Sequence, residues 1–157
     1  MKIVICCVGR TDVPHVQESI QIYLDRLKHY IPTELCIVSE QKVWKKMQVE
    51  ARKKAEGEAI LTQLEPGDRA VLLDEKGKQY TSEDFANYLQ KEMSTGAKRL
   101  VFIIGGAYGF SEEIYSAVPA KIALSKMTFS HQMIRTLLLE QVYRGMTILR
   151  NEPYHNR

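Results

Sequence analysis

The chain has 157 residues, of which 45% are hydrophobic and 26% are charged, and its formal net charge at pH 7 is +3. This length and composition predict one soluble globular domain over residues 1–157, large enough to bury a core without disulfide or metal cross-links. The small positive charge allows an anionic partner but does not identify one.

The three cysteines form neither a disulfide framework nor a zinc-binding pattern. Cys6 and Cys7 are adjacent, so they point to opposite faces of a strand, and Cys36 lies in a separate apolar run. We expect reduced core thiols, which fit a cytoplasmic protein. The start of the sequence is too short and too β-branched for a signal peptide, and no apolar run approaches the length of a membrane span, so we expect no membrane association.

Strands and helices alternate along the first half of the chain. Short apolar runs predict strands at Ile3–Val8, Glu34–Val38 and Ala70–Leu73. Apolar residues at helical spacing predict a helix over about 14–30, and the strongly charged segment 41–64 is predicted to form a second helix.

The second half continues the alternation, beginning with a predicted turn at 74–77. The predicted elements are a helix opened by a capping box at Thr81–Asp84, a strand at Leu100–Ile104, a short helix capped by Ser111 and ended before Pro119, a strand at Lys121–Leu124, and a long helix over about 130–150. Together they predict an α/β fold in which a mostly parallel sheet is flanked by helices.

Two strand-to-helix junctions carry the strongest functional signal. The segments Val101–Phe110 and Leu124–Met133 each run from an apolar strand into a loop of small or polar residues and then into a helix. Open α/β sheets bind ligands at the carboxyl ends of their strands, where a ligand lies against bare backbone. We therefore expect one composite pocket between these junctions.

Gly105, Gly106 and Gly109 follow the first of these strands. Their spacing is not that of a dinucleotide-binding loop, no acidic residue stands where a ribose would need one, and the phosphate-binding P-loop motif is absent, which argues against a nucleotide-dependent oxidoreductase. One glycine satisfies a tight turn with positive φ. Three within five residues favour the close approach of a ligand.

The last helix and the tail carry basic and aromatic groups whose roles the pattern leaves open. Glu140 and Arg144 are spaced as a surface ion pair of small energetic value, although basic groups beside a pocket would also suit a phosphate backbone. The tail 151–157 would ordinarily fray, but Tyr154, His155 and Arg157 offer a stacking ring, a titratable group and a phosphate partner.

Four ordered segments together resemble one known family. The set resembles the RlmH family of bacterial 23S rRNA pseudouridine N3-methyltransferases, small members of the SPOUT, or trefoil-knot, superfamily. The resemblance covers essentially the whole chain and is specific as an ordered set, although no segment is specific alone. The segments are Ile103–Gly109, Ala123–Arg135, Leu139–Arg144 and Tyr154–His155.

The resemblance implies a homodimer with a knotted C-terminal part and a pseudouridine substrate in 23S rRNA, modified on the assembled 70S ribosome. It also implies S-adenosyl-L-methionine as methyl donor, and transfer from a sulfonium needs no metal. The implied catalytic candidates are Arg144, Tyr154 and His155. The implied donor-binding residues are Leu73, Gly105, Leu124, Ser125, Lys126, Met127, Thr128 and Phe129.

A competing interpretation is a non-catalytic RNA-binding or ribosome-associated protein that kept the fold and lost the donor. The intact set of three donor loops argues against it. Binding of S-adenosylmethionine to the purified protein would discriminate between the two classes.

Overall fold

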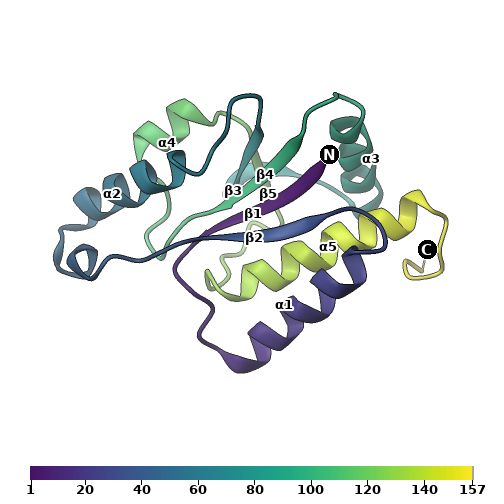
Figure 1. Ribbon diagram of the computed structural model, residues 1–157, viewed down its shortest axis with the longest axis horizontal. Coiled ribbons are helices and arrows are strands. Elements are labelled where there is room, and N and C mark those ends of the chain that lie inside the picture. Colours follow the sequence, from purple (N-terminus) through teal and green to yellow (C-terminus); the bar gives the residue numbers. More distant parts are fainter. Residues whose placement is uncertain (157) are drawn as a thin grey trace.

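The computed structural model describes residues 1–156 and shows a five-stranded sheet between two layers of helices (Figure 1). The strand order is β2-β1-β4-β3-β5, and every neighbouring pair is parallel, so the predicted parallel α/β architecture is confirmed. In chain order the elements are β1 (Lys2–Val8), α1 (Pro14–Leu27), β2 (Thr33–Val38), the 3-10 helix η1 (Lys42–Lys46), α2 (Val49–Leu61), β3 (Arg69–Gln79), α3 (Ser82–Met93), β4 (Arg99–Ile104), α4 (Glu112–Ala117), β5 (Lys121–Ala123) and α5 (Met133–Leu149).

The sheet is buried on both faces, and β1 shows why. Its residues alternate between two separate cores, because successive side chains of a strand point to opposite faces. One core, which includes Cys7, packs against α1, α3 and α5, and the other, which includes Cys6, packs against η1, α2 and α4. Figure 1 shows α1 and α5 on one side of the sheet and α2 and α4 on the other. The prediction that Cys6 and Cys7 face opposite ways is confirmed, and both are free thiols.

The third strand is longer than the sequence predicts. Residues 74–77 continue β3 instead of forming a turn, and the register with β5 shifts between Leu73 and Lys78. Gly77 permits this path, because a Cβ there would lie 2.5 Å from the Ile122 carbonyl carbon. The polar run is typical of a turn in the sequence, whereas in the structure it is the irregular stretch of β3 between the two short stretches that pair with β5.

Two helix boundaries also differ from prediction. The segment 41–64 is not one helix, because the 3-10 helix η1 ends at Lys46 and α2 begins only at Val49. Met47 and Gln48 separate the two helices, because their ψ angles of 153° and 148° are extended, and Trp44 holds η1 in the core on the α2 face. Likewise α5 begins at Met133 instead of Ser130, although the Ser130 hydroxyl accepts a hydrogen bond from the Met133 amide at 3.1 Å.

Other local predictions are confirmed. Thr81 caps α3, accepting a hydrogen bond from the Asp84 amide at 3.1 Å, and Ser111 caps α4. Because all five strands are parallel, their carboxyl ends share one edge of the sheet. The two predicted junctions therefore meet at that edge, beside the end of β3.

Candidate active site

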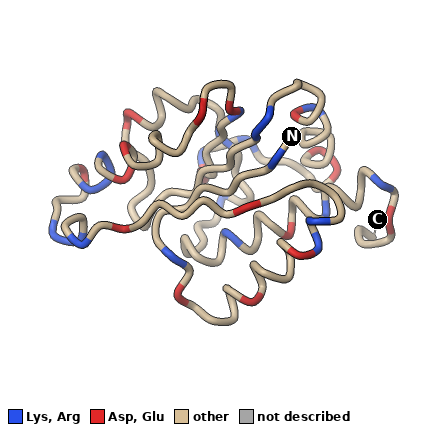
Figure 2. Tube along the Cα trace, in the orientation of Figure 1, with Lys and Arg blue, Asp and Glu red and all other residues tan. Residues whose placement is uncertain are grey.

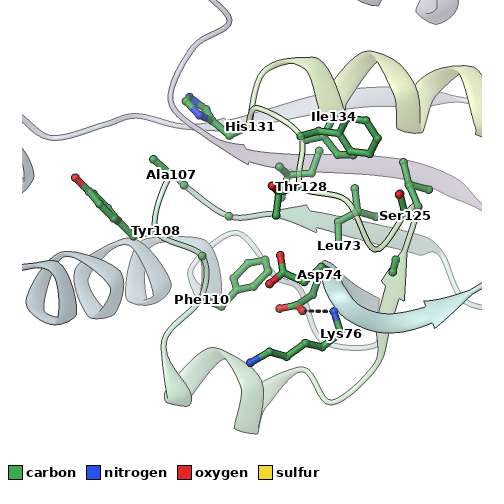
Figure 3. Close-up of a pocket in the computed structure, with 18 of the residues that line it drawn as sticks. Leu73, Asp74, Lys76, Ala107, Tyr108, Phe110, Ser125, Thr128, His131 and Ile134 are labelled. Atoms are coloured by element: carbon green, nitrogen blue, oxygen red, sulfur yellow. Dashed lines mark hydrogen bonds between the residues drawn. The ribbon is translucent and has the colours of Figure 1, made fainter.

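A cavity of about 540 Å³ opens at the carboxyl ends of β3, β4 and β5 (Figure 3). Its walls come from three segments that are far apart in the sequence. The residues that line it include Leu73 and Asp74 at the register shift within β3, Gly105 to Phe110 after β4, and Leu124, Ser125, Met127, Thr128 and Phe129 after β5. His131 and Ile134, at the start of α5, complete the wall.

The glycine turn forms one wall, and each of its glycines has a separate structural reason. Gly109 takes φ of +79° and its amide donates to the Gly106 carbonyl at 3.2 Å, which closes the turn. A Cβ on Gly106 would lie 2.4 Å from a carboxylate oxygen of Glu56, and one on Gly105 would lie 3.1 Å from the Phe110 ring. Packing therefore accounts for glycine at these positions, while the turn still presents backbone to the cavity.

A buried ion pair supports this turn from behind. Glu56 is 2% exposed and accepts a hydrogen bond from the Arg52 Nε at 2.7 Å, so the pKa of Arg52 is raised, chiefly by that bond. The Arg52 guanidinium also lies 5.3 Å from the ring centroid of Tyr108, at the tip of the turn. The local pattern of the sequence does not show that Glu56 is buried at the turn, because Gly106, which lies against its carboxylate, is distant along the chain.

The loop after β5 forms the opposite wall. Leu124 lies at the strand end, and the Ser125 hydroxyl accepts a hydrogen bond from the Met127 amide at 3.0 Å, which tightens the loop. Met127 is 75% exposed and Phe129 is 45% exposed, so this wall is open on its outer side. Lys126 is the one residue of 124–129 that does not line the cavity.

The middle of β3, at its register shift, contributes an acidic group that the sequence pattern does not single out. Asp74 accepts hydrogen bonds from the Tyr115 hydroxyl at 2.5 Å and from the Lys76 amide at 2.8 Å (Figure 3 shows the latter). Burial, followed by the bond to Asp74, raises the pKa of Tyr115, so the phenol stays protonated and holds the carboxylate in place. These contacts fix the irregular stretch of β3 that follows Leu73.

His131 and Arg135 connect the cavity to the end of β1. Arg135 is fully buried and donates to the Val8 carbonyl and the Thr11 hydroxyl, each at 2.8 Å, and to the His131 carbonyl at 3.0 Å. Burial, followed by the charge of Arg135, lowers the pKa of His131, so its imidazole is neutral at physiological pH. A basic residue at this position of a helix could equally be solvated, but Arg135 is not.

The predicted catalytic residues form a second group, at the far end of α5. Arg144 donates two hydrogen bonds to Glu140, at 2.5 and 3.1 Å, and its guanidinium lies 4.8 Å from the centroid of Tyr154. His155 lies 3.3 Å from Arg144 through Nδ1 and 3.1 Å from Glu83 through Nε2. The structure thus brings Arg144, Tyr154 and His155 together, and the described tail is packed against its own chain.

None of these three residues lines the cavity. Ile134 lines it from the first turn of α5, and Arg144 follows ten residues later, which places the group about 15 Å along the helix. The predicted donor-binding residues and the predicted catalytic residues are therefore separated within one chain. Arg157, the tail's further basic candidate, lies outside the described residues.

Within residues 1–156 no group of three or more His, Cys, Asp or Glu side chains is placed to hold a metal ion. Over the same residues, no helix has the length and apolar character needed to cross a membrane.

Comparison with known proteins identifies the family. A sequence model described as a predicted SPOUT methyltransferase matches residues 1–155. Proteins named "Ribosomal RNA large subunit methyltransferase H" are 53% identical over 157 residues in Christiangramia forsetii, covering 100% of both chains, and 54% identical over 156 residues in Parabacteroides distasonis, covering 99% of both. The protein of that name from Flavobacterium psychrophilum is 47% identical over 157 residues, again covering 100% of both chains. The chain therefore belongs to the SPOUT methyltransferase family, as its ordered motifs predict.

Proposed function

We propose that this methyltransferase transfers a methyl group from S-adenosylmethionine to N3 of a pseudouridine in 23S rRNA on the assembled 70S ribosome. The observation that carries the proposal is the cavity, whose backbone-rich walls occur in a chain with full-length relatives named as rRNA methyltransferases. We further propose that residues 1–157 form one SPOUT domain, knotted in its C-terminal part, which works as a homodimer in the cytoplasm.

The cavity suits the donor in size and in the chemistry of its walls. Its volume of about 540 Å³ lies within the range of small-molecule sites. Backbone groups at Leu73, Gly105 and Leu124 can hydrogen-bond a flat base, and the loop 125–129 can enclose the rest of the molecule. When bound, the donor supplies an electrophilic methyl carbon on a sulfonium. The chain must then place the acceptor nitrogen in line with that carbon, so positioning provides much of the catalysis.

Methylation at N3 requires that the acceptor nitrogen lose its proton. As the bond from N3 to the methyl carbon forms and the bond from sulfur to that carbon breaks, N3 loses its hydrogen, so a base or a nearby cation lowers the barrier. The imidazole of His155 can accept a proton, and the always-charged guanidinium of Arg144 can stabilise negative charge on the base. Tyr154 offers a ring for stacking the pyrimidine.

A homodimer would bring the cavity of one chain and the catalytic candidates of the other together at one site. If the partner packs so that its tail meets this chain's cavity, Arg144, Tyr154 and His155 of the partner subunit complete the site. The exposed Met127, Phe129 and Met133 beside the cavity give such a partner an apolar surface to cover.

The test is methylation of 70S ribosomes with labelled donor, followed by mapping of the modified nucleoside. Label at N3 of a pseudouridine in 23S rRNA is the expected result. Protein that binds ribosomes but neither binds the donor nor transfers label would instead support the non-catalytic RNA-binding alternative.

A further inference from the structure

We propose that η1 and the first half of α2 form an RNA-backbone binding surface that leads the substrate to the cavity. This basic surface comprises Lys42, Lys45, Lys46, Arg52, Lys53 and Lys54. The inference rests on the proposed function in one respect, namely that the substrate is ribosomal RNA. It adds which part of the chain holds the phosphates of that RNA.

The excess positive charge of the whole protein lies in this one segment. Residues 40–54 contain six basic and two acidic side chains, a net charge of +4, whereas the entire chain carries +3. The remainder of the chain is therefore slightly acidic. Figure 2 shows blue positions gathered along η1 and α2, and a mixture of both signs over the other elements. Such a local concentration attracts a polyanion far more than the modest total charge suggests.

Five of these six cations are unpaired or only weakly paired. Of the described residues, no carboxylate forms an ion pair with Lys42 or Lys46, and the pairs of Lys45 with Glu40, of Lys53 with Glu50 and of Lys54 with Glu113 are 3.6, 3.3 and 3.7 Å long. Exposed pairs of this kind contribute little, so an RNA phosphate can replace them at small cost. Arg52 differs, since it is committed to Glu56 and Glu40.

The segment is held in one conformation before any ligand arrives. Trp44 is only 6% exposed and anchors η1 in the core, while its amide and carbonyl bond to Gln41 and Met47 at 3.0 and 3.1 Å. Lys42, Lys45 and Lys46 are all exposed around this anchor. Val43 is 57% exposed between them and offers apolar contact to a ribose. A preformed surface binds without the entropic cost of ordering its backbone.

The basic surface is continuous with the cavity. η1 follows the carboxyl end of β2, so it lies along the same sheet edge as the cavity. Lys53 lines the cavity, and Arg52 lies over Tyr108, which also lines it and is 51% exposed. An RNA strand with its phosphates on the lysines can therefore direct a flipped base past Tyr108 into the cavity.

The test compares two double variants with equal net charge. Lys42→Gln with Lys46→Gln removes two charges from the basic surface. The control, Lys91→Gln with Lys98→Gln, removes two exposed charges near the amino ends of the strands, away from the cavity. Methylation of 70S ribosomes is measured over a range of salt concentrations, and donor affinity is measured by calorimetry.

The first variant should raise KM for ribosomes by about tenfold and reduce the salt dependence of KM by a slope of about 1 to 2, because two phosphate contacts are lost. Its kcat and its donor affinity should equal those of the unmodified protein, and the control should change none of these quantities. Equal KM changes in both variants would overturn the inference, because they would reflect net charge alone. Failure of the unmodified protein to methylate ribosomes would instead contradict the proposed function.

A second measurement separates RNA from a ribosomal protein as the partner. A photo-crosslinking amino acid in place of Val43 should attach to 23S rRNA when the complex is irradiated. Attachment to a ribosomal protein alone would overturn the assignment of this surface to RNA.

Discussion

At the scale of single residues, the glycine turn shows how one motif can serve packing and binding together. Gly109 supplies a positive φ, Gly106 makes room for the Glu56 carboxylate and Gly105 makes room for the Phe110 ring. The glycine spacing predicts a turn with a positive φ here, and three glycines within five residues were interpreted as evidence of a ligand. That ligand stays a prediction, because the packing contacts alone already require small residues.

Gly105→Val should abolish S-adenosylmethionine binding in a folded protein. The new Cβ would lie 3.1 Å from the Phe110 ring, so the added methyl groups must displace that ring or project into the cavity. Calorimetry should show no donor binding, with Gly105→Ala retaining part of the affinity, and circular dichroism should show a native fold. Unchanged affinity in folded Gly105→Val protein would remove Gly105 from the donor site.

His131 should make the stability of the protein depend on pH. Burial lowers the pKa of His131 in the folded state below its usual value of 6.5, so below about pH 6.5 the unfolded chain binds more protons. The contribution of His131 to the free energy of unfolding should be fully present above pH 6.5 and should be lost as pH falls towards the folded-state pKa. Urea unfolding between pH 5 and 8 should show this loss for the unmodified protein and a smaller one for His131→Asn. If the free energies of unfolding of the two proteins change with pH in parallel, the pH dependence does not come from His131.

At the scale of elements, the start of α5 joins three parts of the chain. The Gln132 side chain accepts hydrogen bonds from the Asp12 and Val13 amides at 2.9 and 3.2 Å, and so holds the two residues that precede α1. Arg135 ties the same region to the end of β1. These contacts position the wall of the cavity nearest to His131.

Arg135→Met should destabilise the protein by about 3 kcal/mol, because the Val8 carbonyl and the Thr11 hydroxyl lose a charged donor in a buried place. Arg10→Met is the matched control, since Arg10 lies exposed in the neighbouring loop and should change stability by no more than about 0.5 kcal/mol. Urea denaturation measures both. A cost for Arg135→Met no larger than that of the control would show that its hydrogen bonds are not important for folding.

The elements also show what the sequence can predict. Apolar runs located every strand, because buried parallel strands are apolar on both faces, as β1 and β4 are. The polar second half of β3 was missed, since an edge pairing with β5 leaves no such signal. In the site, the strand-end loops were found from local pattern. Asp74 and Glu56 were not, because their partners Tyr115 and Gly106 are brought near only by folding.

At the scale of the whole molecule, the cavity and the tail lie at opposite ends of α5. The protein should therefore be a stable homodimer, because a single chain leaves the exposed Met127, Phe129 and Met133 uncovered and its catalytic candidates distant from the cavity. Sedimentation at micromolar concentration should give twice the chain mass of 18.1 kDa. A mass near that of one chain would refute the dimer and, with it, the shared site.

The tail provides the sharpest test of that site. Deleting residues 151–157 should abolish methylation and weaken donor binding less, because Tyr154 and His155 would act on the acceptor. A mixed dimer of tail-deleted and Gly105→Val chains has one cavity with an intact Gly105, on the tail-deleted chain. If the tail acts in trans, the Gly105→Val chain supplies the tail for that cavity and activity returns. An inactive mixture of folded, exchanged chains would exclude the trans arrangement. Full activity of the tail-deleted homodimer would exclude any catalytic role for the tail.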